Sequence, residues 1–298
     1  MNRIIVSFLS LFLLSLCNLV LFAEEIREWE SVDGRKISAK LLNYDPEIGY
    51  LEIRRDDGVE FRLSADQLSE KDHAYLSEYL QQIEERRSEA AALAGESKTF
   101  SPFGETKGRF HVYFPSVYSA DSEIPMLILF SSVGGGRRIM EQFRDAGEEN
   151  GWIVVGCDYF RNNMDEDEAL EVFPLVLEEI ESAVPHHDPN RLYLGGLSGG
   201  AWRAFVYSVK FDRPWKGIIS CGGWLGREPE RDYPENLAVA FVNGDEDEAA
   251  NHYVPRDTKI LEKHNGTAKL FEFPGGHVVG PTWVLSEAMK WVDDNTGD

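Results

Sequence analysis

The sequence feature that most constrains the fold is the pentad Gly196-Leu-Ser-Gly-Gly200, which directly follows the apolar residues 192–195. Its pattern, Gly-x-Ser-x-Gly, is typical of a tight strand-to-helix turn that exposes a serine nucleophile. Glycine suits the outer positions because a side chain there would collide with neighbouring backbone, and because glycine tolerates a positive φ. The pentad therefore predicts a strand, a turn at Ser198 and a helix at 200–210. The alternative is a glycine-rich turn whose serine has no chemical role.

The segment from Ser101 onward alternates apolar, strand-like runs with helical stretches, an order typical of a parallel sheet. Near-continuous apolar runs such as Met126-Leu-Ile-Leu-Phe130 indicate strands that are covered on both faces. We therefore expect a three-layer α/β domain with a mostly parallel sheet. The expected strands are 110–114, 126–130, 153–157, 192–195, 217–221, 239–242 and 270–273, and the expected helices lie near 139–150, 168–183, 200–210, 256–264 and 281–292.

The region before this domain has short alternating runs, each with its apolar residues on one face. Strands this short indicate a small β unit, a half-barrel, closed by tight Asp-Gly turns. Ser69 then begins a helix, with Asp72 at capping-box spacing. The alternating runs are 36–41, 50–54 and 59–63, and the turns are Asp33-Gly34 and Asp57-Gly58. The expected organisation is an export segment at 1–23, the β unit at 24–80, a charged, alanine-rich helical linker at 81–100 and the α/β domain at 101–298.

The N-terminus predicts export. Met1-Asn-Arg3 is followed by an apolar run from Ile4 to Ala23, as in a signal peptide. This run is also long enough to span a membrane, so an uncleaved anchor at 4–23 is the alternative. We therefore expect a secreted or periplasmic protein, with membrane attachment only if the segment is retained.

The net charge and the cysteine content argue against a nucleic-acid partner and against a metal site. The net charge of −22 argues against nucleic acid, which attracts basic surfaces. Cys157 and Cys221 lie inside apolar runs and are expected to be buried, small hydrophobic residues. No Cys/His spacing suggests a metal site, and no cofactor is expected.

A serine nucleophile needs a base, and the base needs an acid to orient it. On α/β folds of this kind these residues follow the serine in the order acid, then histidine. An apolar run ends at Asn243-Gly-Asp-Glu-Asp247, and a later one ends at Pro274-Gly-Gly-His277. His277 is therefore the candidate base, with an ordinary loop residue as its alternative. Asp247 and Asp245 are the candidate acids.

Residues 109–293 resemble α/β-hydrolases of the group that contains dienelactone hydrolases, polyhydroxybutyrate depolymerases and feruloyl or acetyl-xylan esterases. The resemblance rests on Asp188-Pro-Asn-Arg191, Ser198-Gly-Gly-Ala201, Gly244-x-x-Asp247 and Gly275-Gly-His277. It implies that Ser198 is the nucleophile, His277 the base and Asp247 the acid. It also implies an oxyanion hole made by backbone N–H groups, one of them that of Gly199.

The second oxyanion donor is expected from the loop after the strand at 126–130. Here the chain departs from the usual His-Gly entrance, since Ser131-Ser132 and Val133 stand in its place. A backbone N–H survives any change of side chain, so Ser132 and Val133 are the candidates.

Residues 27–76 resemble the small SH3-like domain named for its homology to the yeast Sla adaptor. The matching motifs are Arg27-Glu-Trp29, Asp33-Gly-Arg-Lys36, Arg54-Arg-Asp-Asp-Gly58 and Leu68-Ser-Glu-Lys-Asp72 before Tyr75-Leu76. The resemblance assigns this unit no ligand. A packing or spacing role is the simpler interpretation.

The segment between 221 and 239 is too short to hold an inserted lid. We therefore expect an open cleft, with Trp224 and Trp202 at its rim, that admits a bulky or polymeric ester. The sequence thus predicts an exported serine hydrolase that cleaves carboxylic esters through an acyl-enzyme, with esters of a decorated polysaccharide or a polyester as candidate substrates. A catalytically silent binding protein with the same fold is the alternative.

Overall fold

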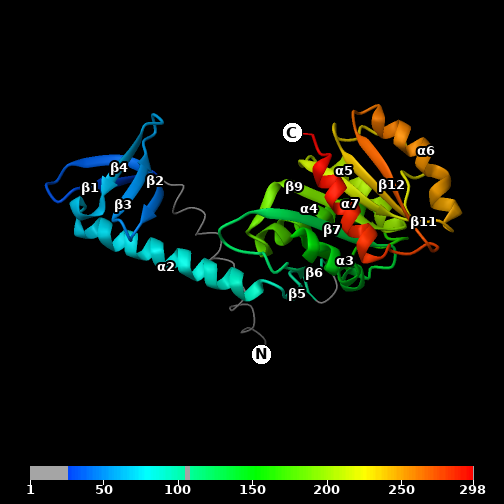
Figure 1. Ribbon diagram of the computed structural model, residues 1–298, viewed down its shortest axis with the longest axis horizontal. Coiled ribbons are helices and arrows are strands. Elements are labelled where there is room, and N and C mark those ends of the chain that lie inside the picture. Colours follow the sequence, from blue (N-terminus) through cyan, green and yellow to red (C-terminus); the bar gives the residue numbers. More distant parts are fainter. Residues whose placement is uncertain (1–25, 105–107, 298) are drawn as a thin grey trace. The chain divides into compact units, whose positions relative to one another are not determined.

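The chain consists of two compact units, one ending at Glu89 and the other beginning at Ala90. The computed structural model describes residues 26–104 and 108–297 (Figure 1). The predicted export segment or anchor at 1–23 lies outside these residues. In the part of the chain that is described, every helix is too short or too polar to cross a bilayer.

The first unit is a four-stranded antiparallel sheet followed by a helix. The strands lie in the order β1-β2-β3-β4, and Trp29, Leu41, Leu51 and Ile53 point into a common core with Leu76 of the helix. The alternating pattern thus correctly predicts the buried faces of β2 and β3, whereas Val59 of the third run is exposed. Whether this unit is the SH3-like domain stays a prediction. Its elements are β1 (Arg27–Glu30), β2 (Lys36–Asp45), β3 (Tyr50–Arg54), β4 (Glu60–Ser64), the 3-10 turn η1 (Ala65–Gln67) and α2 (Glu70–Leu93).

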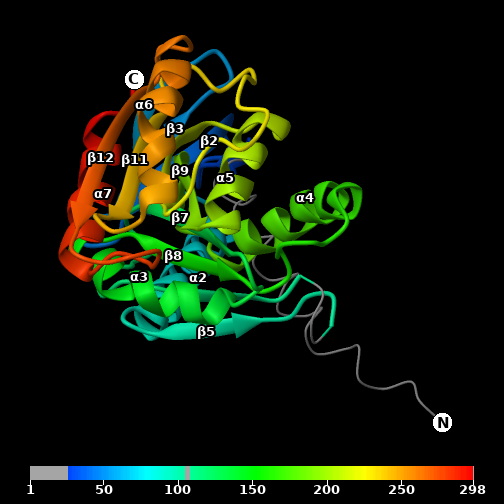
Figure 2. The same cartoon turned by 90° about the vertical axis from the view of Figure 1, so that its right-hand side faces the viewer.

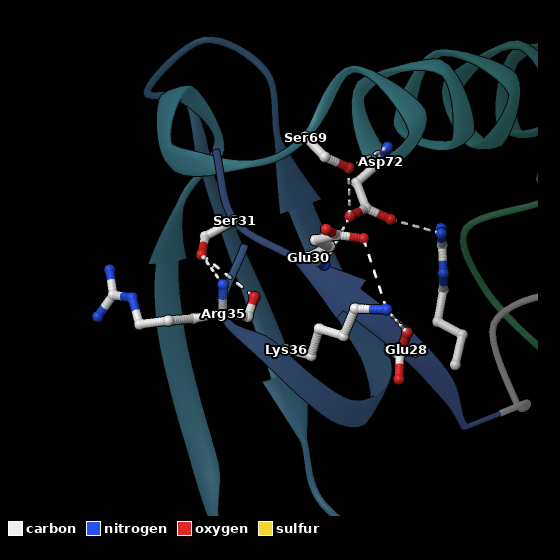
Figure 3. Close-up of polar contacts among 8 residues, drawn as sticks. Glu28, Glu30, Ser31, Arg35, Lys36, Ser69 and Asp72 are labelled. Carbon is white, nitrogen blue, oxygen red and sulfur yellow. Dashed lines mark hydrogen bonds and ion pairs between the residues drawn. The ribbon is translucent and has the colours of Figure 1, made fainter. Parts of the chain in front are cut away.

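The buried carboxylate of Asp72 joins the start of α2 to β1. It accepts hydrogen bonds from the Glu30 N–H at 2.7 Å and the Ser69 hydroxyl at 3.0 Å (Figure 3). Its other oxygen pairs with the Arg27 guanidinium at 2.5 Å. That guanidinium lies over the Tyr75 ring, 3.6 Å from its centre. The residue expected to take part in a capping box therefore binds the first strand as well, which locks the helix to the sheet.

The second unit is built on an eight-stranded sheet with the order β12-β11-β10-β9-β7-β8-β6-β5. The strands from β12 to β8 are parallel, and β6 and β5 are antiparallel at one edge. The predicted mostly parallel α/β architecture is confirmed. The strands are β5 (Ser97–Phe100), β6 (Phe110–Tyr113), β7 (Ile124–Ser131), β8 (Ile153–Cys157), β9 (His187–Leu197), β10 (Trp215–Cys221), β11 (Ala238–Gly244) and β12 (Thr267–Phe273).

Both faces of this sheet are covered by helices, so its central strands are apolar throughout. On β7, Ile128 and Phe130 enter the core on one face, whereas Leu127 and Leu129 enter the core on the other. The first core is covered by α4 (Glu166–Ala183), α5 (Gly199–Lys210) and α6 (Glu248–Glu262), and the second by α3 (Gly136–Asn150) and α7 (Thr282–Asp294). Figure 2 shows α6 and α7 on opposite sides of the β11–β12 end of the sheet.

Two elements differ from the sequence-based expectation. Residues 97–100, placed in the helical linker, form the edge strand β5, because pairing with β6 orders a segment that has no apolar alternation of its own. Helix α6 begins at Glu248 instead of near Arg256, since Pro255 is accommodated inside the helix. Because proline normally ends a helix, the sequence pattern did not predict the first two turns of α6.

The order of strands reverses between β7 and β9. The chain goes from β7 to β8 on one side and then places β9 on the other side of β7. In open parallel sheets a crevice forms at the carboxyl ends of the strands at such a point. The segments that follow β7 and β9 must therefore form the walls of this crevice.

We expect Asp72→Asn to loosen the first unit, because it leaves the partly buried Arg27 without its charge partner. Breaking a buried pair in this way costs about 3 kcal/mol. Hydrogen–deuterium exchange of the full chain should therefore show faster exchange at β1 and β2. Asp56→Asn is the control, because Asp56 is exposed. Equal exchange in the two variants would contradict the role given to Asp72.

Candidate active site

Ser198 lies on a strained turn between β9 and α5. Its backbone has φ 58° and ψ −119°, a region that residues other than glycine rarely adopt. A Cβ at Gly196 or at Gly200 would overlap the carbonyl oxygen of Phe130, at the end of β7. Both glycines are therefore required by the close approach of β7 to the turn, which is the geometry that the pentad predicts.

Ser198 and His277 both lie against residues 221–222, at the end of β10. The Ser198 N–H donates to the Cys221 carbonyl at 2.9 Å. A Cβ at Gly222, where φ is 54°, would lie 2.9 Å from His277 Nδ1 and 3.1 Å from Asp247 Oδ2. The absence of a side chain at 222 thus makes room for the imidazole beside the segment that holds the serine.

His277 is hydrogen-bonded to Asp247 at 2.7 Å, from Nδ1 to Oδ2. Asp247 is buried and caps α6, since its other oxygen accepts the Ala250 N–H at 3.3 Å. Because an ionised carboxylate only accepts hydrogen bonds, the imidazole proton resides on Nδ1 and leaves Nε2 free to act as a base. Asp245 faces elsewhere and accepts the Gly275 N–H at 2.9 Å.

The structure therefore brings Asp247, not Asp245, to the histidine. Across residues 26–104 and 108–297, no hydrogen bond joins the His277 ring to the Ser198 hydroxyl. Such bonds are often long without substrate and tighten when it binds.

Two amide side chains, the buried Asn243 and the half-buried Asn251, hold the strand ends around this pair. Asn243 accepts the Gly222 N–H at 3.1 Å and donates to Asn251 at 2.9 Å. Asn251 in turn donates to the Gly244 carbonyl at 2.9 Å. This chain of bonds ties the glycine beside His277 to the first turns of α6, which begins at the Asp247 cap.

The oxyanion donors differ in how well they are placed. The Gly199 N–H is the first of α5 and follows Ser198, whose side chain makes no capping hydrogen bond. It is therefore free to bind an anion at the helix N-terminus. In the loop after β7, the Val133 N–H makes a long contact of 3.4 Å with Ser131 Oγ. In the same loop, the Ser132 carbonyl accepts the Asn162 N–H at 2.9 Å.

The Asn162 side chain is a site residue that sequence reasoning missed. It lies so close to Gly199 that a Cβ there would overlap the amide. Asn162 also lines the cleft that contains Ser198. The only available signal was its position shortly after β8, at the carboxyl edge of the sheet, where polar residues commonly face a site.

The cleft at Ser198 has a volume of about 430 Å³ and is lined by both predicted tryptophans, Trp202 and Trp224. Trp224 stacks on Tyr253 of α6, with ring centres 5.3 Å apart. The edge of Trp202 packs on Gly226, where a Cβ would lie 2.6 Å from its indole nitrogen. Stacking on α6 therefore fixes Trp224, and close packing on Gly226 fixes Trp202, as the aromatic walls of the cleft.

Helix α6 also anchors the loop that carries Trp224. The fully buried Asp257 accepts the Leu225 N–H at 2.8 Å and pairs with Arg256 at 2.6 Å. Burial raises the pKa of Asp257, although the Leu225 N–H and Arg256 oppose this shift. Arg256 donates to the Gly226 carbonyl at 3.3 Å as well. The same helix thus carries the acid that faces His277 and fixes a wall of the cleft.

Both cysteines of the second unit are buried free thiols, as the sequence predicts, and burial raises the pKa of each. Their lack of exposure makes them unsuitable as nucleophiles. Within the part of the chain that the structure describes, no group of His, Cys, Asp and Glu residues has the arrangement of a metal site.

No protein-family model and no curated protein sequence matches this chain. Solved structures do match it. A thermostable carboxylesterase cloned from a metagenomic library is 14% identical, with 74% of this chain and 98% of that chain covered and a TM-score of 0.53. An arylesterase is 9% identical, with 77% and 99% covered and a TM-score of 0.52. The second unit therefore has the fold of these two esterases.

We expect Gly200→Ala to destabilise the second unit by about 2 kcal/mol or more, because the new methyl group would overlap the Phe130 carbonyl. Chemical denaturation followed by tryptophan fluorescence measures this change in the free energy of unfolding. Gly276→Ala is the matched control, since a Cβ at 276 meets open space. It should change stability by less than about 0.5 kcal/mol. Equal losses in the two variants would refute the packing argument.

Proposed function

We propose that the protein is a serine hydrolase that cleaves carboxylic esters through an acyl-enzyme, with Ser198, His277 and Asp247 as its catalytic residues. The observation that carries this proposal is the Asp247–His277 hydrogen bond beside the segment that binds the strained Ser198 turn. Similar carboxylesterase and arylesterase folds support the reaction class.

In the first half of the reaction, Ser198 Oγ attacks the ester carbonyl carbon while His277 Nε2 takes the hydroxyl proton. The carbonyl oxygen becomes negative and is bound by the Gly199 N–H at the positive end of α5. The Asn162 amide beside Gly199 and the Ser132 or Val133 N–H are the candidates for the second donor. The Asp247 carboxylate keeps the imidazole in the required tautomer and stabilises its charged form.

The tetrahedral intermediate then expels the alcohol, which takes the proton from His277. This step leaves the acyl group on Ser198. Water next attacks the acyl carbon, with His277 again as the base, and the carboxylic acid departs as Ser198 regains its proton. The proton that leaves with the alcohol is replaced by one from the water, so Ser198 and His277 recover their starting protonation states without a cofactor.

The cellular setting and substrate size also belong to this proposal. The N-terminal sequence favours export to the periplasm or beyond the cell. The lid-free cleft with Trp202 and Trp224 favours a bulky or polymeric ester. The first unit is, on this proposal, the SH3-like domain that its sequence motifs resemble.

Ser198→Ala should lower kcat on p-nitrophenyl acetate by at least about 10⁴-fold, because no other group replaces the nucleophile. A fluorophosphonate probe should label the wild type and not this variant. Ser122→Ala, a change of an exposed serine, should retain both activity and labelling. Equal ester hydrolysis by wild type and Ser198→Ala would instead favour the catalytically silent binding protein.

Asp247→Asn and Asp245→Asn form a matched pair that tests the acid. An amide at position 247 would favour the wrong imidazole tautomer, so kcat should fall about 10⁴-fold. At 245 the amide oxygen can still accept the Gly275 N–H, so kcat should stay within about threefold of wild type. Steady-state kinetics on p-nitrophenyl acetate measures both, and a larger loss at 245 would reverse the assignment.

A further inference from the structure

The arginines of the second unit fall into two groups. One group forms ion pairs with carboxylates: Arg109, Arg144, Arg191, Arg203, Arg213 and Arg256. The other group has no ion pair to any residue that the structure describes, and we call its members the unpaired arginines: Arg137, Arg138, Arg161, Arg227 and Arg231. In a chain with a net charge of −22, five unpaired arginines require an explanation.

Two of the unpaired arginines lie in the cleft that contains Ser198. Arg227 and Arg231 line the cleft that contains the serine, together with a single acidic residue, Glu228. Arg231 donates to the Leu225 carbonyl at 2.8 Å, which positions its guanidinium without neutralising it. The wall of the candidate active site is therefore cationic.

Arg137 and Arg138 line a second cavity, of about 830 Å³, at the start of α3. The acidic residues there are Asp158 and Glu141. Asp158 is neutralised locally, since it pairs with Arg109 at 2.5 Å, contacts His111 at 3.1 Å and accepts the Gly136 N–H at 2.8 Å. Burial favours a higher pKa for Asp158, but these hydrogen bonds and charges lower it below its usual range. Arg137 and Arg138 are left exposed and unpaired.

Both cavities include residues at the carboxyl ends of the parallel strands, Asp158 after β8 in one and Ser198 after β9 in the other. Asp158 lines the second cavity and Asn162 lines the cleft, so at most about 14 Å of chain separates them. Between them Arg161 pairs through its backbone with Val133. We call the unpaired arginines that line the two cavities, together with Arg161 between Asp158 and Asn162 in the chain, the cationic path.

From this path we infer the substrate class: the scissile ester is carried on a polysaccharide whose neighbouring sugars bear carboxylates, as in a uronic acid chain. The inference rests on the proposed hydrolase function. Arginine forms paired hydrogen bonds with planar carboxylates, which lysine cannot do, and lysine lines neither cavity. Trp202 and Trp224 offer flat surfaces on which sugar rings stack. The cationic path also draws anionic chains to an otherwise acidic protein, which would repel them elsewhere.

The test compares kcat/KM on two polymers acetylated to the same degree, polygalacturonate and neutral glucomannan, with p-nitrophenyl acetate as the small ester. Wild type should favour the polygalacturonate ester by about tenfold or more at low ionic strength, and salt should reduce this preference. Arg137→Gln/Arg138→Gln and, separately, Arg227→Gln should lower the polygalacturonate-to-glucomannan ratio about tenfold, mainly through KM. Arg227→Lys should restore only part of the ratio.

Lys290→Gln is the control for loss of one positive charge, because Lys290 is exposed on α7 and lines neither cavity. It should leave the ratio unchanged. Equal kcat/KM on the two polymers, or an equal loss on both in the arginine variants, would overturn the inference. A stronger preference for an acetylated, sulfated galactan would overturn the assignment to carboxylates.

Binding separates this inference from the proposed function. Ser198→Ala protein should be retarded in affinity electrophoresis by polygalacturonate and not by glucomannan. The added Arg137→Gln/Arg138→Gln changes should abolish the retardation. Retardation by polygalacturonate without any ester hydrolysis by wild type would uphold the anionic ligand and refute the hydrolase. Hydrolysis of small esters without this retardation would uphold the hydrolase and refute the anionic ligand.

Discussion

The candidate site depends on one close approach, that of the Phe130 carbonyl to the glycines on either side of Ser198. Because neither Gly196 nor Gly200 has a side chain, the end of β7 contacts the turn between β9 and α5 directly. This contact fixes the strained backbone of Ser198 and places the loop after β7 beside it. The candidate oxyanion donors in that loop, at Ser132 and Val133, directly follow the residues that make this contact.

Helix α6 is the second organising element. Its N-terminal cap, Asp247, binds His277, and two turns later Tyr253, Arg256 and Asp257 hold the loop that carries Trp224. A single helix therefore sets both the orientation of His277 and one wall of the cleft. Asn251, in its first turn, extends this control to the strand ends through Asn243.

The electrostatics of the site contrast with those of the whole chain. A net charge of −22 keeps the protein dispersed but repels anionic ligands. Unpaired arginines line the cleft of Ser198 and the cavity at the start of α3, and they reverse the sign of the charge locally. The other arginines form ion pairs within the fold, such as Arg191 with Asp293. Their charges are therefore neutralised and do not attract a ligand.

The sequence by itself determined the alternation of strands and helices in the second unit, the buried faces of the first, and the turn at Ser198. These features follow from local periodicity and from the steric needs of glycine, which act over a few residues. Strand β5 and the first turns of α6 escaped prediction because pairing with β6 and the tolerance of Pro255 are set by the surrounding fold. Only the tertiary structure decided that Asp247 and not Asp245 faces His277, that Asn162 lies over Gly199, and that Arg227 and Arg231 line the cleft of Ser198. Such contacts join residues distant along the chain, and their geometry depends on strand order and register, which no local pattern encodes.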